Sequence, residues 1–140
     1  MTDLGHWSYA GILTESTEIP FGFVYIITNC SNNKKYIGKK QCQTVRKRPP
    51  LKGKTRKRRE IVETDWKTYT SSSNDLNNDI ELHGKENFKF EILQWCNSKW
   101  MLSYVEAKLQ FENEVLLDSS YYNGIINLRI GKKPASYDSL

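Results

Sequence analysis

The sequence predicts a small domain of the α/β class, of the α+β type, with a three-stranded antiparallel sheet flanked by helices. A continuous run of β-branched and aromatic residues at 23–28, followed by a turn and a second short apolar run, indicates two paired strands. Two segments with helical spacing lie after residue 70, and an alternating, strand-like segment separates them. The order β-β-loop-α-β-α is typical of this class. The chain has 140 residues, enough for one domain with a single core.

The first half of the chain divides into an arm and a hairpin. Residues 1–20 contain aromatic and apolar residues without a clear period, so we expect an arm that packs on the domain formed by 21–140. The run at 23–28 predicts a buried strand. Residues 30–33 have turn chemistry and residues 35–38 form a second short strand, which completes a β-hairpin.

The second half carries the helix signals. Ser72 and Asp75 have the spacing of a capping box and Gly84 stands where a helix would end, which predicts a helix over 74–83. Residues 88–92 alternate apolar and polar side chains, which predicts a half-buried strand. Ser98 is positioned to cap a longer helix. Its expected buried stripe is Leu102, Val105, Leu109 and Leu116.

The composition excludes several classes of protein. Apolar residues make up 38% and charged residues 26%, which argues against collagenous, disordered and disulfide-dense chains. No stretch approaches the ~18 consecutive apolar residues that span a bilayer, and the start of the chain lacks the pattern of a secretory signal. The three cysteines, Cys30, Cys42 and Cys96, are scattered, so we expect small core groups rather than a disulfide framework or a zinc site. We therefore expect a cytoplasmic protein with no membrane partner.

Positive charge is concentrated in one part of the chain. The net charge is +5, yet thirteen Lys and Arg and no acid lie between Lys34 and Arg59, and the rest of the chain is net negative. With Pro49, Pro50 and Gly53, residues 41–63 predict a basic loop inserted in the domain, with a helical turn near its end. Such a block indicates a phosphate-contacting surface; a solvated loop or a localisation tract is the alternative. The expected nucleic-acid contacts are Lys40, Lys47, Arg48, Lys52, Lys54, Arg56, Lys57, Arg58 and Arg59.

Two tyrosines, Tyr25 and Tyr36, lie eleven residues apart on the two strands of the predicted hairpin. The passages Gly22-Phe23-Val24-Tyr25 and Tyr36-Ile37-Gly38 resemble the paired motifs of the GIY-YIG nuclease family, the first of them in degenerate form. The resemblance runs from about Gly22 to Asn127, and residues 82–88 are similar to a passage of phage homing members. It implies the family's fold and a catalytic set made of Tyr25, Tyr36, Lys39, Arg46, Glu106 and Asn123.

The chemistry of phosphodiester hydrolysis suits these residue types. It requires a deprotonated water, stabilisation of the charge on phosphorus, and stabilisation of the leaving oxygen. Tyrosine has a pKa near ~10, so a tyrosine base near neutral pH needs cations or a metal beside it. An arginine donates two parallel hydrogen bonds to phosphate oxygens. A single carboxylate such as Glu106, with waters and phosphate oxygens, fits Mg²⁺ (or Mn²⁺) better than zinc.

The resemblance implies roles for these residues. Tyr25 is the base, helped by Tyr36 or Lys39, Arg46 contacts the phosphate, and Glu106 binds the metal. Because the basic loop is long, Arg56, Arg58 or Arg59 could replace Arg46. Glu112 and Glu114 are the rivals of Glu106, and Asn127 is the rival of Asn123. Each residue also has an alternative without a catalytic role. Tyr25 and Tyr36 could be ordinary strand tyrosines, Glu106 a solvated helix carboxylate, and Asn123 a turn residue. Tyr69 and Ser71–Ser73 could contact the phosphate backbone, but we expect them to serve chiefly as the helix cap.

The resemblance thus implies a divalent-metal-dependent DNA endonuclease of the phage homing type that leaves 5′-phosphate and 3′-hydroxyl ends. A viral chain would act in the cytoplasm of its host cell. The alternatives are a restriction-type or structure-specific nuclease and a nucleic-acid-binding module without catalysis. DNA is the expected partner. A homodimer or an accessory DNA-binding protein is the expected source of additional specificity.

Overall fold

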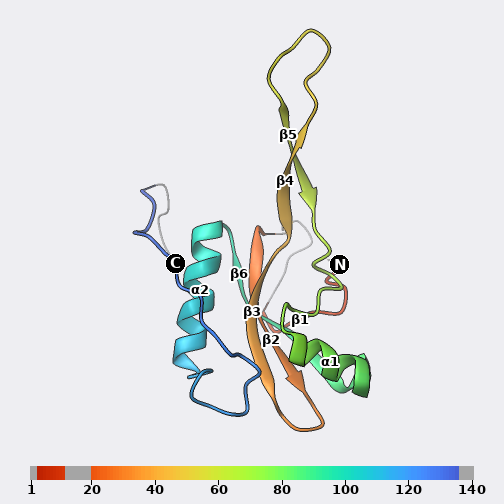
Figure 1. Cartoon of the computed structure of the whole chain (residues 1–140), viewed down its shortest axis with the longest axis vertical. Coiled ribbons are helices and arrows are strands. Elements are labelled where there is room, and N and C mark those ends of the chain that lie inside the picture. The colour runs from red at the N-terminus through yellow and green to blue at the C-terminus, as the bar shows by residue number, and fades with distance from the viewer. Residues whose placement is uncertain (1–2, 12–19, 136–140) are drawn as a thin grey trace.

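The computed structural model describes residues 3–11 and 20–135 and shows an α+β fold (Figure 1). A four-stranded mixed sheet has the order β1-β6-β2-β3, and a separate two-stranded ribbon is formed by β4 and β5. The sheet strands are β1 (Ser8–Tyr9), β2 (Gly22–Asn29), β3 (Lys35–Gln41) and β6 (Phe88–Cys96). β2 runs antiparallel to both of its neighbours, as the hairpin prediction required.

The sheet has four strands, whereas the sequence predicted three antiparallel ones, and the additional strand is β1. Ser8 and Tyr9 pair in parallel with Glu91 and Ile92 of β6, so the sheet is mixed. A two-residue strand has no period that a sequence pattern can show. Trp7 anchors it, because the indole is buried and donates a hydrogen bond from Nε1 to the carbonyl of Trp66, 2.6 Å away. Residues 1, 2 and 12–19 of the arm lie outside the described residues.

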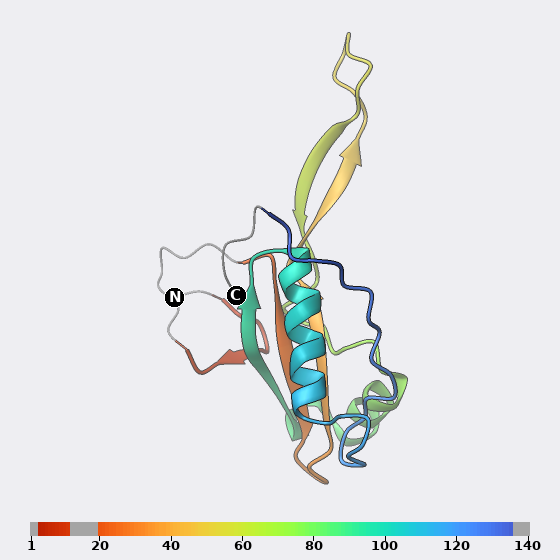
Figure 2. The same cartoon turned by 90° about the vertical axis from the view of Figure 1, so that its left-hand side faces the viewer.

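Both faces of the sheet are covered. β2 contributes Phe23, Tyr25 and Ile27 to an aromatic core with Trp7 and Trp66 on one face. On its other face, Val24 packs in a second core with Met101, Leu102 and Val105 of α2, which spans Lys99–Glu112. The helices accordingly lie on opposite sides of the sheet (Figures 1 and 2). This layering leaves the outer edge of β3 as the place where residues from both sides can meet.

The helices confirm the capping signals. α1 spans Asn74–His83 as predicted, although Ser73 rather than Ser72 is the cap and accepts the N–H of Leu76. α2 spans Lys99–Glu112, and the hydroxyl of Ser98 accepts the N–H of Met101 as predicted. A short 3₁₀-helix, η1 (Lys85–Asn87), leads into β6.

The predicted stripe of α2 is confirmed at three of its four positions. Leu102 and Val105 are buried, and Leu109 packs partly buried against the same cluster. Leu116 is exposed, because the helix ends at Glu112 and the chain then turns so that Val115 enters the core instead.

The predicted basic loop at 41–63 is mostly a β-ribbon. β4 (Gln43–Arg48) pairs antiparallel with β5 (Arg58–Glu63), from Gln43↔Glu63 to Arg48↔Arg58. The prolines and the glycine that suggested a loop are confined to the tip, residues 49–57, and no helical turn follows them. The ribbon stands out from the sheet at one end of the molecule (Figure 1).

Two smaller findings complete the fold. Cys42 and Cys96 are buried as predicted, whereas Cys30 is exposed in the turn after β2 and is not a core group. No helix within residues 3–11 and 20–135 is long and apolar enough to cross a membrane.

Candidate active site

A cavity of about 360 Å³ lies at the outer edge of β3. Five parts of the chain contribute to its wall: β2, β3, the segment between β5 and α1, α2 and the C-terminal segment. The lining residues are Tyr25, Tyr36, Lys39, Tyr69, Ser72, Glu106, Gln110, Ile125 and Asn127. The two predicted tyrosines and the predicted helical acid therefore share one cavity.

Gly38 explains how the tyrosines meet. It pairs with Tyr25 across the two strands, and its missing side chain leaves room for the Tyr25 ring to lie across β3. A Cβ at Gly38 would come within 2.5 Å of the Tyr25 hydroxyl and 2.8 Å of the Tyr36 ring. The ring centroid of Tyr25 lies 6.2 Å from that of Tyr36 and 6.3 Å from that of Tyr69.

The environment of the tyrosines opposes their ionisation. Tyr25 is only 1% exposed. Burial raises its pKa well above the ordinary value, and Tyr36, Tyr69 and Glu106 add to the rise. Burial also raises the pKa of Tyr36, against a hydrogen bond from Ser72, and Glu106 raises it further. The shift is opposite to the one that a base at neutral pH needs, so activation requires a cation brought close to the hydroxyls.

Glu106 is a half-buried carboxylate of α2 that faces this cavity. Burial raises its pKa, and Lys39 opposes that rise. The Nζ of Lys39 lies 3.8 Å from Oε1 of Glu106 and donates a hydrogen bond to Oγ of Ser103 at 3.1 Å. Within residues 3–11 and 20–135, no three His, Cys, Asp or Glu side chains gather as a metal cage. One carboxylate among hydroxyl and amide groups is a donor set that fits Mg²⁺ completed by waters and substrate oxygens.

Arg46 lies outside this cavity. It is exposed on β4 and lines a neighbouring groove with Lys39, Lys40 and Lys99. Lys39 borders both spaces, so the groove and the cavity adjoin at this residue. The structure does not bring Arg46 to the tyrosines. The rival arginines lie on the outer ribbon or its tip, at positions 56, 58 and 59.

Asn123 is also placed away from the cavity wall. It is buried, its Oδ1 accepts the N–H of Ile37 at 3.1 Å, and its Nδ2 donates to the carbonyl of Ile37 at 2.9 Å. Nε2 of Gln110 donates to the same carbonyl at 2.9 Å. Asn123 therefore completes the outer edge of β3 and holds the strand that carries Tyr36. Its catalytic role stays a prediction. Asn127 is the asparagine that lines the cavity.

The comparison with protein families shows which family the chain belongs to. A family model described as "Putative endonuclease segE, GIY-YIG domain" matches residues 7–126. The chain belongs to this GIY-YIG family of phage homing endonucleases. The family suggested by the paired tyrosine motifs is thereby confirmed. No curated protein and no solved structure matches the chain.

Tyr69 and Ser72 also line the cavity of this GIY-YIG domain, whereas the sequence indicated them chiefly as a helix cap. A hydrogen bond joins the hydroxyls of Tyr25 and Tyr69, and Ser72 hydrogen-bonds with both Tyr36 and Tyr69. Lys40 Nζ lies 4.1 Å from the centroid of the Tyr69 ring and pairs with Asp65 at 2.8 Å. The only local signal was an aromatic residue beside a serine run, which is equally typical of a helix cap.

Proposed function

We propose that this GIY-YIG domain is a divalent-metal-dependent DNA endonuclease that cleaves phosphodiester bonds by direct attack of water. The observation that carries the proposal is the meeting of Tyr25, Tyr36 and Glu106 in one cavity. Lys39 belongs both to its wall and to that of a neighbouring groove with several cations. A binding module without catalysis would need the cations but would have no use for a carboxylate facing the tyrosine hydroxyls.

In the proposed reaction the Tyr25 phenolate takes a proton from water as the water oxygen bonds to phosphorus. The bond from phosphorus to the 3′ oxygen then breaks, and that oxygen gains a proton from solvent, which leaves 5′-phosphate and 3′-hydroxyl ends. Tyr36 and Tyr69 position the Tyr25 hydroxyl, and Lys39 lies where a phosphate would enter from the groove. Glu106 would hold the metal, which when bound stabilises the leaving oxygen and the charge developing on the phosphate.

The position of Arg46 limits its part in this proposal. On the exposed side of β4, its guanidinium suits a phosphate outside the cavity, beside the scissile one. Within the cavity wall, Lys39 is the cation best placed for the scissile phosphate. The raised pKa of Tyr25 is also what a DNA-binding module without catalysis would show. The test must therefore measure cutting and binding separately.

The test is incubation of the purified protein with supercoiled plasmid and Mg²⁺, followed by mapping of the ends. We expect nicked or linear DNA with 5′-phosphate and 3′-hydroxyl termini and no cutting in chelator. Glu106→Ala should abolish cutting and keep most of the DNA affinity. Glu112→Ala is the matched control, because this exposed carboxylate lies at the end of the same helix and pairs with Lys108. Cutting that persists in chelator, or Glu106→Ala that cuts like wild type, would contradict the proposal.

A further inference from the structure

The two faces of the β4–β5 ribbon differ in what they adjoin. Side chains alternate between faces along a strand, and directly paired residues share a face. One face, which we call the groove face, carries Thr44, Arg46, Arg48, Arg58, Glu60 and Val62. The other, which we call the outer face, carries Gln43, Val45, Lys47, Arg59, Ile61 and Glu63.

The groove face forms part of the basic groove beside the cavity. Thr44, Arg46 and Val62 line this groove of about 580 Å³. The opposite wall comes from the end of β3 and the start of α2, with Leu102 and Ser103. Its cations are Lys39, Lys40, Arg46 and Lys99. Its acids are Asp65 and Glu63, and Glu63 stands at the base of the ribbon, where it borders both pockets. Asp65 is paired with Lys40, and the N-terminal end of α2 adds positive potential, so the groove favours a polyanion.

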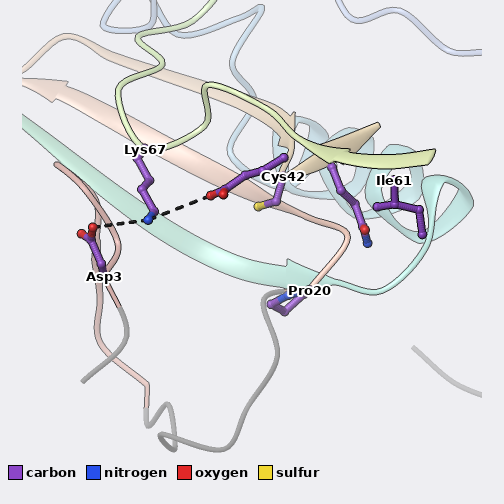
Figure 3. Close-up of a pocket in the computed structure, with 7 residues that line it drawn as sticks. Asp3, Pro20, Cys42, Ile61 and Lys67 are labelled. Atoms are coloured by element: carbon purple, nitrogen blue, oxygen red, sulfur yellow. Dashed lines mark hydrogen bonds and ion pairs between the residues drawn. The ribbon is translucent and has the colours of Figure 1, made fainter. Parts of the chain in front are cut away.

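The outer face adjoins a different pocket, of about 430 Å³ (Figure 3). Ile61 and Glu63 line it with Asp3 and Lys67. The Lys67 ammonium is held between two carboxylates, 3.3 Å from Asp3 and 4.0 Å from Glu63, as the dashed lines in Figure 3 show. Ile61 is 70% exposed beside this pocket. At the base of the ribbon the outer side therefore combines an exposed apolar side chain with a lysine that is already paired with two carboxylates.

The ribbon also extends to one side of the cavity only. β3 leads into β4 through the single residue Cys42, and Arg48 lies twelve positions after Tyr36. At about 3.3 Å per residue this path reaches at most about 40 Å, close to the ~34 Å of one B-DNA turn. At the other end of α2 the chain carries Glu112, Glu114 and Asp118. Three acids therefore lie at the end of α2 away from the ribbon.

We propose that the β4–β5 ribbon is a one-sided DNA arm. It lies along about one helical turn of duplex on one side of the cleaved bond, with the groove face against the phosphates. The substrate then requires duplex on that side and little on the other. This inference rests on the proposed endonuclease function, and it adds which flank of the DNA is held and which face of the ribbon holds it.

The first test uses duplexes that place a cut mapped on the plasmid at varied distances from either end. Affinity is measured with Glu106→Ala and cutting with wild type. Removing the ten or so base pairs on one side of the cut should lower affinity at least tenfold. Removing those on the other side should lower it less than threefold. Equal losses from both sides, or no loss from either, would overturn the one-sided arm even if the plasmid is cut normally.

The second test compares the faces by binding alone, so it remains decisive if no cutting is found. Arg46→Gln with Arg58→Gln should reduce the slope of log affinity against log salt by nearly 2, since each phosphate contact contributes about 0.9. Lys47→Gln with Arg59→Gln removes the same charge from the outer face and should reduce the slope by less than 1. Lys89→Gln with Lys108→Gln is the charge-matched control away from the ribbon, and melting curves check folding. An outer-face effect as large as the groove-face effect would refute the assigned orientation.

Discussion

The site depends on a few residues whose role follows from the space around them. Gly38 lies opposite Tyr25, and the ring of Tyr25 crosses the strand at that point. The glycine is needed here for close approach rather than for an unusual backbone angle. Asn123 has a comparable supporting role, because both of its amide atoms satisfy the backbone of Ile37.

Gly38→Ala should disturb both tyrosines, because the added Cβ would meet rigid ring atoms at 2.5 to 2.8 Å. We expect a loss of about 1–3 kcal/mol in the free energy of unfolding and a larger loss of plasmid cutting than of DNA binding. Gly124→Ala is the control, since its Cβ would meet nothing within 4 Å. Denaturant unfolding and single-turnover cutting measure the two effects. Wild-type stability and cutting in Gly38→Ala would show that the rings are not in this arrangement.

His6 predicts a pH dependence of stability. Burial and the nearby Lys85 lower its pKa to about 4, although its hydrogen bond to the carbonyl of Tyr69 opposes the shift. Its Nδ1 is buried without a hydrogen-bond partner among the described residues. The unfolded chain, with a His pKa near ~6.5, binds the proton more readily, so this stability is present above about pH 6.5 and is lost as the pH falls towards 4.

The measurement is the free energy of unfolding between pH 7 and 4. Its decline should be smaller in His6→Gln, which keeps a donor for Tyr69 but does not titrate, by roughly 1–2 kcal/mol after allowance for partial exposure. Parallel curves for wild type and variant would contradict the burial of a neutral imidazole.

The residues that could be predicted are those whose signal is local or whose order matches the family. Tyr25, Tyr36 and Glu106 belong to such an ordered set, and the structure brings them together. Tyr69 is 44 residues from Tyr25, in a segment without regular structure, so periodicity cannot reveal their contact. The position of Asn123 in the chain predicts a place in the site, whereas only the fold shows that its side chain hydrogen-bonds to the edge of β3.

At the scale of elements, cores and caps were predictable and exposed strands were not. A continuous apolar run predicts β2, and serine caps predict both helices. In the ribbon, cations occupy both faces and nearly every side chain is exposed, so the strands lack alternation. Pro49, Pro50 and Gly53 then suggested a loop across a segment in which they form only the tip. The pairing of β1 is a long-range contact with almost no sequence of its own.

The outer edge of β3 offers a test at this scale. Asn123→Ala removes the side chain that satisfies the buried N–H of Ile37, which should cost about 1–3 kcal/mol of unfolding free energy. Asn127→Ala, at an exposed position of the same segment, should change it by less than about 0.5 kcal/mol. Urea unfolding of the two variants measures the difference. Equal stabilities would mean that Asn123 does not hold the strand.

At the scale of the whole molecule, the densest group of cations lies on the ribbon and its groove, at one end of the fold (Figure 1). The ribbon and groove carry cations, whereas the far end of α2 carries acids. The sequence revealed the basic block, but it could not show that the block is a projecting ribbon (Figures 1 and 2). That placement makes long-range attraction to DNA strongest at the ribbon.

DNA affinity should therefore fall steeply as salt rises, because bound phosphates release counterions. Replacing the four tip cations with glutamine should flatten the log–log slope by up to about 3.6, at 0.9 per phosphate contact; they are Lys52, Lys54, Arg56 and Lys57. Titration of a labelled duplex at several salt concentrations gives the slope. A salt-independent affinity in the wild-type protein would remove the ribbon from DNA binding.

The most direct test of the catalytic cavity is single-turnover cutting by Tyr25→Phe and Tyr36→Phe, with DNA affinity and melting temperature measured alongside. Each change removes one hydroxyl and keeps the ring. If the Tyr25 hydroxyl takes the proton from water, Tyr25→Phe should cut at least about 100-fold more slowly, with affinity within threefold of wild type. Tyr36→Phe should also cut more slowly, by a smaller factor. Cutting at the wild-type rate by a folded, DNA-binding Tyr25→Phe protein would contradict the account.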